Sequence, residues 1–196
     1  SISSSLPLHL QKGIEAHRAL DSFTDTHPVF RESTRLLASG YGKWAGVIAD
    51  ILYDHFLATH WPQLSETPLT TFSKECYSDL NRFLVLLPAV TKRIFPYMIA
   101  DDWLANYRYV PFLHRVFAGM NRRTQGRAGM AGAAFFLSCH YTELENHFMR
   151  FFPEAYTFSL TFNASLSSVN YLYPHHHKAI SLDKIPHLFP VELVAL

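Results

Sequence analysis

Cysteine is scarce in this sequence, and the two cysteines that occur stand far apart. Cys76 and Cys139 belong to no CxxC or similar spacing among the 196 residues. This leaves no basis for a scaffold held together by disulfides. Two isolated cysteines in a chain of this size indicate buried thiols in a reducing compartment, so we expect the protein in the cytoplasm.

An excess of charge of one sign is also missing, since 17 Lys and Arg face 16 Asp and Glu and the formal net charge is +1. This balance carries no global signature of nucleic-acid or membrane binding, so an acidic partner must meet a local basic patch. No apolar run reaches about 18 residues without charge, so we expect no transmembrane helix. The first five residues lack the basic and apolar regions of a signal peptide and contain no Met, which suggests a fragment or a processed chain.

What the sequence does contain is helical periodicity over most of its length, in a chain long enough for one domain with a sizeable core. We expect helices over Gln11–Thr24, Val29–Ser39, Lys43–Thr59, Leu69–Leu87, Ile94–Tyr107, Val110–Arg122 and Ala133–Phe152. Residues 1–158 are therefore predicted to form an all-α domain of about six to seven helices. From Ser159 the apolar residues alternate with polar ones, which predicts an irregular or strand-like tail over 159–196, packed on the domain or poorly ordered.

The stretch from Ala49 to Trp61 is a strongly apolar predicted helix that nevertheless carries Asp50, Asp54 and His55. Positions i and i+4 share one helix face, so the two carboxylates would project together. Carboxylates on an apolar helix are costly unless they are paired, hydrogen-bonded or bound to a metal. Taken alone, the stretch allows two interpretations: a satisfied structural polar group, or part of a functional site.

A second set of such residues lies on the first predicted helix. His17 and Asp21 are four residues apart, and so are Asp21 and Asp25. Asp25 could instead cap the next helix, because Asp25 or Thr26 before Pro28 is typical of a helix start with proline in its first turn. Imidazole and carboxylate together suit Mn²⁺, Fe or Zn²⁺, and carboxylate-rich sites favour Mn²⁺ or Mg²⁺. Two His/Asp sets on two helices predict a metal site between them.

With these motifs assembled, the chain resembles the acyl carrier protein phosphodiesterase family over roughly Pro7 to Tyr156. The resemblance rests on two motifs that are specific in combination. They are Gly13-Ile14-Glu15 with His17-Arg18, Asp21 and Thr24-Asp25, and Tyr53-Asp54-His55-Phe56-Leu57 with His60-Trp61 and Gln63-Leu64-Ser65. Weaker similarities are Asp102-Trp103-Leu104, Tyr107-Arg108, Gly119-Met120 and Arg122-Arg123.

The resemblance implies a compact all-helical bundle distantly related to the HD-domain phosphohydrolases. It implies hydrolysis of the phosphodiester that joins 4′-phosphopantetheine to the carrier-protein serine, with Mn²⁺ as the cofactor and Mg²⁺ or Fe²⁺ as alternatives. A metal held by His and Asp can polarise a phosphoryl oxygen and lower the pKa of bound water. The roles that follow are metal ligands or bases of metal-bound water for Asp21, Asp25, Asp54 and His55, a ligand or acid for His17, and a phosphate clamp for Arg18.

Carrier proteins are acidic, so the resemblance also implies a basic docking surface. The best candidates are Lys92 with Arg93, and Arg122 with Arg123 and Arg127. Each of them could equally be an ordinary solvated charge. A charge at the rim of an interface mainly changes the association rate and its salt dependence.

Members of the family usually begin with a His-containing apolar stretch and a Gly-Asn and Ala-Asp motif upstream of the Gly13-Ile14 equivalent, and this chain lacks that segment. The absence predicts an incomplete metal shell and weak or no activity. Three hypotheses therefore stand: the carrier-protein phosphodiesterase, an HD-like phosphohydrolase of another phosphodiester or a nucleotide, and a truncated helical module that binds carrier protein without cleaving it. A panel of phosphodiesters separates the first two, and binding without turnover identifies the third.

Overall fold

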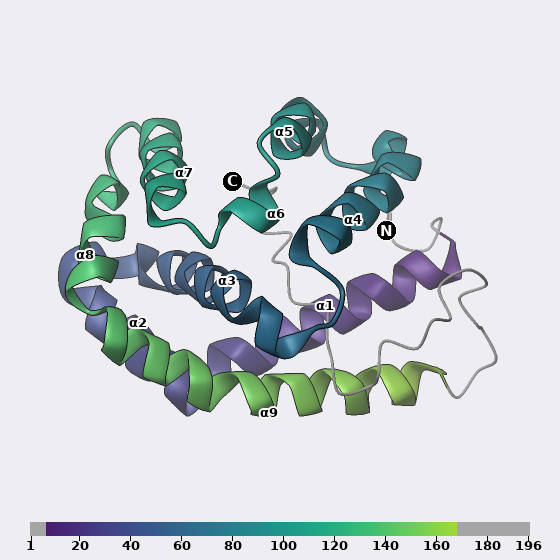
Figure 1. The fold of residues 1–196 in the computed structure, drawn as a ribbon, viewed down its shortest axis with the longest axis horizontal. Coiled ribbons are helices and arrows are strands. Elements are labelled where there is room, and N and C mark those ends of the chain that lie inside the picture. Colours follow the sequence, from purple (N-terminus) through teal and green to yellow (C-terminus); the bar gives the residue numbers. More distant parts are fainter. Residues whose placement is uncertain (1–6, 168–196) are drawn as a thin grey trace.

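A computed structural model describes residues 7–167, and the chain is all-helical over that range, without a strand (Figure 1). The helices are α1 (Leu8–Thr26), α2 (Pro28–Tyr41), α3 (Ala45–Leu64), α4 (Leu69–Arg82), α5 (Ala89–Ala100), α6 (Trp103–Asn106), α7 (Val110–Arg123), α8 (Ala133–Cys139) and α9 (Tyr141–Ser167). Short 3₁₀ turns cover Gly42–Trp44, Leu84–Leu86 and Met130–Gly132. The predicted all-α class is confirmed.

Helix α3 is the centre of the domain. Twelve of its twenty residues are buried, so it is enclosed on nearly all sides rather than amphipathic. Figure 1 shows α9 on one side of α3, and α5, α6 and α7 on the opposite side. Because α3 is surrounded in this way, any polar side chain on it needs a partner from a neighbouring helix.

A buried group of polar side chains joins α2, α3 and α9. The Ser33 hydroxyl lies 2.9 Å from the Tyr53 hydroxyl and 3.0 Å from His147 Nδ1. At the surface beside it, Arg150 donates to both carboxylate oxygens of Glu32, at 2.8 and 3.4 Å. These contacts fix the position of α9 against α2 and α3.

Several helix ends differ from the expected ones. The side chain that caps α2 is His27, whose Nδ1 accepts from the backbone N–H of Val29, and not Asp25 or Thr26. The helices expected to end at Thr59 and Phe152, just before a proline, both continue: Pro62 lies in the last turn of α3 and Pro153 lies inside α9. A proline disrupts only the local hydrogen bonds of its turn, and tertiary packing on both sides of it keeps the helix going.

The expected single helices over Ile94–Tyr107 and Ala133–Phe152 are each divided in two. Asp102, with a φ of 38°, separates α5 from α6, and its carboxylate accepts from the Ala105 backbone N–H at 3.4 Å and from the Ser73 hydroxyl at 3.1 Å. Aspartate is one of the few residues that adopt this left-handed conformation readily. The second break lies at His140, between α8 and α9.

The strand-like prediction for Ser159–Ser167 is wrong, because α9 continues to Ser167. Phe158 stacks on Phe23 of α1 with ring centroids 4.5 Å apart, and Lys12 Nζ donates to the Leu166 carbonyl at 2.6 Å. These contacts with α1 favour the helix over the alternating pattern. The rest of the predicted tail, residues 168–196, lies outside the described residues.

Within the described range, no helix is both long and apolar enough to cross a bilayer. Both cysteines are free thiols, but the prediction that both are buried is only half right. Cys76 is partly buried against a cluster of apolar side chains from α4, α5 and α6, whereas Cys139 at the end of α8 is exposed.

Candidate functional site

The predicted residues of α1 form one local group. His17 Nε2 lies 3.3 Å from Asp21 Oδ2, one turn further along the same helix. Burial is the main reason why the pKa of Asp21 is raised, His17 opposes that shift, and the nearby Asp25 carboxylate adds to it. Arg18, next to His17, is exposed. The structure therefore brings His17, Asp21 and Asp25 together along one face of α1, as the sequence predicted.

Asp54 is the most unusual side chain of α3. It is only 5% exposed, and its Oδ2 has no hydrogen-bond partner among the described residues. Burial, with a further contribution from Asp50 one turn earlier, raises the pKa of Asp54 well above its usual range. The phenol of Tyr107 is in the same situation: its oxygen is buried without a partner, and burial together with the nearby Asp54 raises its pKa. Native interiors rarely leave two neighbouring polar groups unpaired, so the pair marks this place as a candidate site.

His55 has both ring nitrogens engaged. Nδ1 lies 2.8 Å from the backbone carbonyl of Tyr107, and Nε2 lies 3.1 Å from the Tyr141 hydroxyl. Burial lowers the pKa of His55, so the ring is held neutral. The carbonyl can only accept, so Nδ1 carries the proton and Nε2 accepts from the tyrosine. In this arrangement His55 links α3 to Tyr107 and to α9, and the lone pair of Nε2 is engaged by the Tyr141 hydroxyl.

The metal site implied by the resemblance can be tested against this geometry. Asp54 supplies one unpaired carboxyl oxygen, a donor that suits Mn²⁺. Nε2 of His55 is engaged by the Tyr141 hydroxyl, and Asp21 is bonded to His17. Residues 7–167 contain no group of three or more His, Cys, Asp or Glu side chains placed to hold a metal ion. The described residues do not bring such a group together, and the identity of the metal and its ligands stay predictions.

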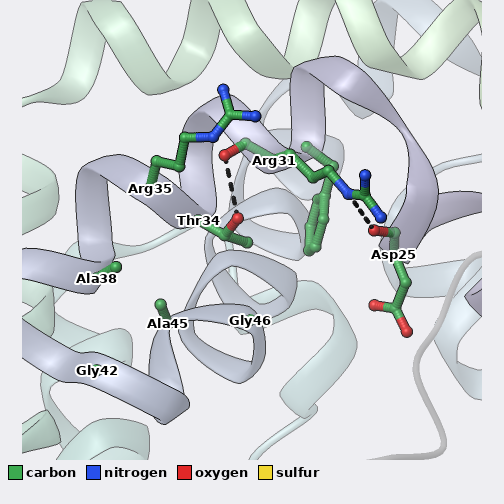
Figure 2. A pocket seen from close by; sticks show the side chains of 9 residues that line it. Asp25, Arg31, Thr34, Arg35, Ala38, Gly42, Ala45 and Gly46 are labelled. Carbon is green, nitrogen blue, oxygen red and sulfur yellow. Dashed lines mark hydrogen bonds between the residues drawn. The ribbon is translucent and has the colours of Figure 1, made fainter.

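A pocket of about 410 Å³ lies between α2, the start of α3 and the end of α1. In Figure 2, Arg31, Thr34 and Arg35 of α2 form one wall of this pocket. Gly42, Ala45 and Gly46 form the wall opposite. Asp25 closes one end, so the pocket contains one of the residues that the sequence singled out and two arginines that it did not.

The predicted docking residues lie on the surface, on the side of α3 away from α9. Lys92 and Arg93 are exposed on α5, and Lys92 Nζ donates to the Val85 carbonyl at 2.7 Å. The remaining three are at and beyond the end of α7: Arg122, Arg123 and Arg127. Figure 1 places α5 and α7 on the same side of the molecule. Exposed basic groups on α5 and α7 are consistent with an acidic partner, and no described contact tests that role.

The motifs therefore identified Asp54, which is buried without a partner, and missed Tyr107 as well as the arginine pair. Tyr107 belongs to one of the weaker motifs, but nothing in the sequence shows that its phenol lies beside Asp54. The signal that could have found the arginines is their spacing, because Arg31 and Arg35 are four residues apart on one helix face.

Comparison with known proteins gives a consistent result. Residues 1–155 match the model of the family described as acyl carrier protein phosphodiesterase. Three relatives carry that same name. The protein of Yersinia pestis is 33% identical over 148 residues, which are 75% of this chain and 77% of the relative. That of Serratia proteamaculans (strain 568) is 32% identical over 143 residues, 72% of this chain and 74% of the relative. The Escherichia coli O157:H7 protein is 33% identical over 153 residues, 76% of this chain and 78% of the relative.

No solved structure matches the chain, so the HD-like relationship of the fold stays a prediction. The family match covers α1 to α8 and the first half of α9, and so includes every element that carries a predicted site residue. On the extent of this match and the identity to its relatives, the chain belongs to the acyl carrier protein phosphodiesterase family.

Proposed function

We propose that this protein hydrolyses the phosphodiester between 4′-phosphopantetheine and the serine of an acyl carrier protein, which yields the apo-carrier protein. The observation that carries the proposal is Asp54. It lies in the motif shared with the family, and its carboxyl oxygen is buried without a partner. An unpaired buried carboxyl group costs folding free energy, so its presence is better explained by function than by structure.

The two candidate groups suit different halves of the reaction. Water attacks the phosphorus, the bond from phosphorus to the serine oxygen breaks, and that oxygen takes up a proton. The His17–Asp21 pair is a partly exposed imidazole oriented by a carboxylate, which suits a base that accepts the proton of the water. Burial raises the pKa of Asp54, which favours its protonated form, and a protonated carboxyl group suits an acid that supplies a proton. Arg18 is exposed beside His17 and can bind a phosphate oxygen.

Manganese stays the proposed cofactor, with Mg²⁺ or Fe²⁺ as alternatives, although the described residues do not assemble a metal site. The two unpaired thiols suit a reducing compartment, so we also propose the cytoplasm as the place of action.

The acidic carrier protein is proposed to dock on α5 and the end of α7. Replacement of both Arg122 and Arg123 by glutamate should lower the association rate by roughly tenfold or more at low salt, with much less effect at high salt. Arg82 provides a matched control, because it is exposed but already paired with Asp79. Stopped-flow binding at two ionic strengths distinguishes these cases, and equal rates for all variants would remove this surface from the proposal.

The deciding experiment incubates the purified protein with holo-acyl carrier protein and follows the loss of phosphopantetheine by mass spectrometry. It is run with Mn²⁺, with Mg²⁺ and with a chelator, and alongside the Asp54→Asn variant. Conversion to the apo-protein by the wild type and not by Asp54→Asn supports the function, and its loss in chelator supports the metal. A folded wild type that leaves the holo-protein intact under every condition refutes the proposed function. A panel of other phosphodiesters is then tested.

A second function is favoured by one observation, namely that residues 7–167 contain no group of three or more His, Cys, Asp or Glu side chains placed to hold a metal ion. A module that binds carrier protein without cleaving it needs no such group. Calorimetry with holo- and apo-carrier protein tests it directly. Binding of both forms without turnover identifies the module, and turnover excludes it.

A further inference from the structure

Large apolar side chains gather on the surface around the turn between α4 and α5. Nine such side chains are exposed in residues 7–167, and five of them fall between residues 80 and 99: Leu80, Val85, Leu86, Tyr97 and Ile99. Val85 is the most exposed of the nine, at 84%, and lies in the 3₁₀ turn between the two helices. Single exposed apolar residues are ordinary, but a group of them bordered by charge is typical of an interaction surface.

The fold does not account for the exposed apolar side chains of α5, because this helix already has a separate buried face. That face packs against α4 and α6 through Ile94, Phe95 and Met98. The opposite face carries Tyr97 and Ile99, which are 65% and 45% exposed, together with the exposed Lys92 and Arg93. Arg93 and Tyr97 lie one turn apart, and Lys92 and Ile99 lie two turns apart. Apolar and basic side chains therefore share one exposed face of α5.

A hydrogen bond joins the 3₁₀ turn to this face of α5. Lys92 Nζ donates to the Val85 carbonyl at 2.7 Å, so the turn lies beside the basic end of the helix. The exposed side chains of the turn and of α5 together form what we name the α4–α5 surface: Val85, Leu86, Lys92, Arg93, Tyr97 and Ile99.

The charge of the α4–α5 surface is of one sign. No Asp or Glu occurs between Asp79 and Asp101, and Asp79 is bonded to Arg82 at 3.2 Å. An acidic partner therefore finds complementary charge here as well as apolar area. The end of α7, the other predicted docking region, offers charge alone, because no large apolar side chain is exposed over residues 110–132.

Helix α6 connects the α4–α5 surface to the Asp54–Tyr107 pair. The Tyr77 hydroxyl of α4 accepts from the Leu104 backbone N–H of α6 at 3.0 Å, and Leu104 packs in the same apolar cluster as Phe95 of α5. Tyr107 follows α6 directly and lies near Asp54. Figure 1 shows α5 and α6 on the same side of α3. A carrier protein on this surface would therefore contact helices that lead to the candidate acid Asp54.

From these observations we infer that the α4–α5 surface is the apolar centre of the carrier-protein docking site, and that the end of α7 contributes only charge at its rim. The inference rests on the proposed function for the identity of the partner. Protein interfaces commonly have an apolar centre rich in aromatic residues and a polar rim. Val85 and Tyr97 are the two most exposed apolar side chains of this surface, so they hold the partner in place, whereas Lys92 and Arg93 mainly attract it.

Binding kinetics of the full chain with apo-acyl carrier protein test the surface without relying on catalysis, because the apo form has no phosphodiester to cleave. Tyr97→Ser should weaken binding by roughly tenfold, mainly through faster dissociation, and Val85→Ser should act in the same way. Lys92→Glu should instead slow association, most of all at low salt. Phe135→Ser is the matched control and should bind as the wild type does, since Phe135 is 69% exposed but lies on α8. Thermal unfolding confirms that each variant is folded.

Three results overturn the inference. The first is absence of binding by the wild type, and the second is wild-type binding by both Tyr97→Ser and Val85→Ser. The third is a different occupant of the surface: a dimer seen by light scattering, or sedimentation with phosphatidylglycerol vesicles, that Tyr97→Ser abolishes while carrier-protein binding stays intact.

The surface and the proposed function fail in different ways. Turnover of holo-carrier protein with the KM unchanged in Tyr97→Ser overturns the surface and leaves the function standing. Binding of carrier protein that needs Tyr97, without any turnover by the wild type, supports the surface and refutes the hydrolase.

Discussion

Replacement of Asp54 by leucine, a side chain of nearly the same shape, is expected to make the protein more stable and inactive. Asp54 is 5% exposed, and its Oδ2 has no partner among residues 7–167. An unsatisfied buried polar group costs about 1–3 kcal/mol, and an apolar side chain of the same shape does not carry that cost. For a domain of this size the gain corresponds to a rise in the unfolding midpoint of roughly 2–12 °C.

The effect should also depend on pH. Burial and the Asp50 carboxylate raise the pKa of Asp54 in the folded protein above the model-compound value of 3.8. Between the two pKa values the folded chain keeps a proton that the unfolded chain releases, so this residue makes stability fall as pH rises through that window. The leucine variant has no such group, so its stability does not fall in this way. The difference in stability between the variant and the wild type should therefore grow with pH until the pH passes the raised pKa.

Thermal unfolding followed by circular dichroism, at about pH 5 and about pH 8, measures both effects. A chelator is present throughout, so that no metal ion contributes. Asp101→Leu is the control, because Asp101 is exposed and its replacement should leave the midpoint nearly unchanged. A leucine variant at position 54 that unfolds at a lower temperature than the wild type at pH 8 would refute the reasoning.

Other residues give further expectations. Burial raises the pKa of the Cys76 thiol to about 12. In the native protein a thiol reagent should therefore label the exposed Cys139 quickly and Cys76 only on unfolding. Fast labelling of both thiols in the native protein would contradict the structure. Asp102→Ala should lower the free energy of unfolding by about 1–3 kcal/mol, through loss of a helix cap and through left-handed strain, and Asp102→Asn should lower it much less. Urea denaturation that ranks the two variants equally would count against this cap. Ser33→Ala should cost about 1–3 kcal/mol, because it leaves the buried Tyr53 hydroxyl without this partner; a neutral effect in the same assay would mean that water replaces the serine.

Much of the fold could be predicted from local pattern. The apolar run of α3 and the 3.6-residue periodicity of α1, α2, α4 and α7 predict helices that the structure contains. Local pattern could not show that packing against other helices would keep a helix intact through a proline, or through a stretch whose apolar and polar residues alternate. Pro153 lies inside α9 because α1, α2 and α3 hold that helix in place on both sides of the proline. The same packing makes Ser159–Ser167 helical although its apolar residues alternate.

The candidate site could be predicted only where its members share one helix. The His17–Asp21 pair follows directly from i, i+4 spacing. The Asp54–Tyr107 pair and the α2–α3 pocket bring together residues from different helices, and no spacing rule connects these residues. For His55 the sequence allowed a metal ligand or a structural polar group. The structure shows its hydrogen bonds to Tyr107 and Tyr141, and its role as a metal ligand stays a prediction.

The length of α9 has a practical consequence for anyone who shortens this protein. The family match stops at residue 155, in the middle of the helix. An expression boundary drawn there would delete the ring of Phe158 that covers Phe23 and the carbonyl of Leu166 that receives Lys12. It would thereby uncover the apolar side of the helix that carries His17, Asp21 and Asp25. A recombinant fragment meant for assay or crystallisation should therefore extend at least to Ser167, and a loss of activity in a shorter one would say nothing about the chemistry.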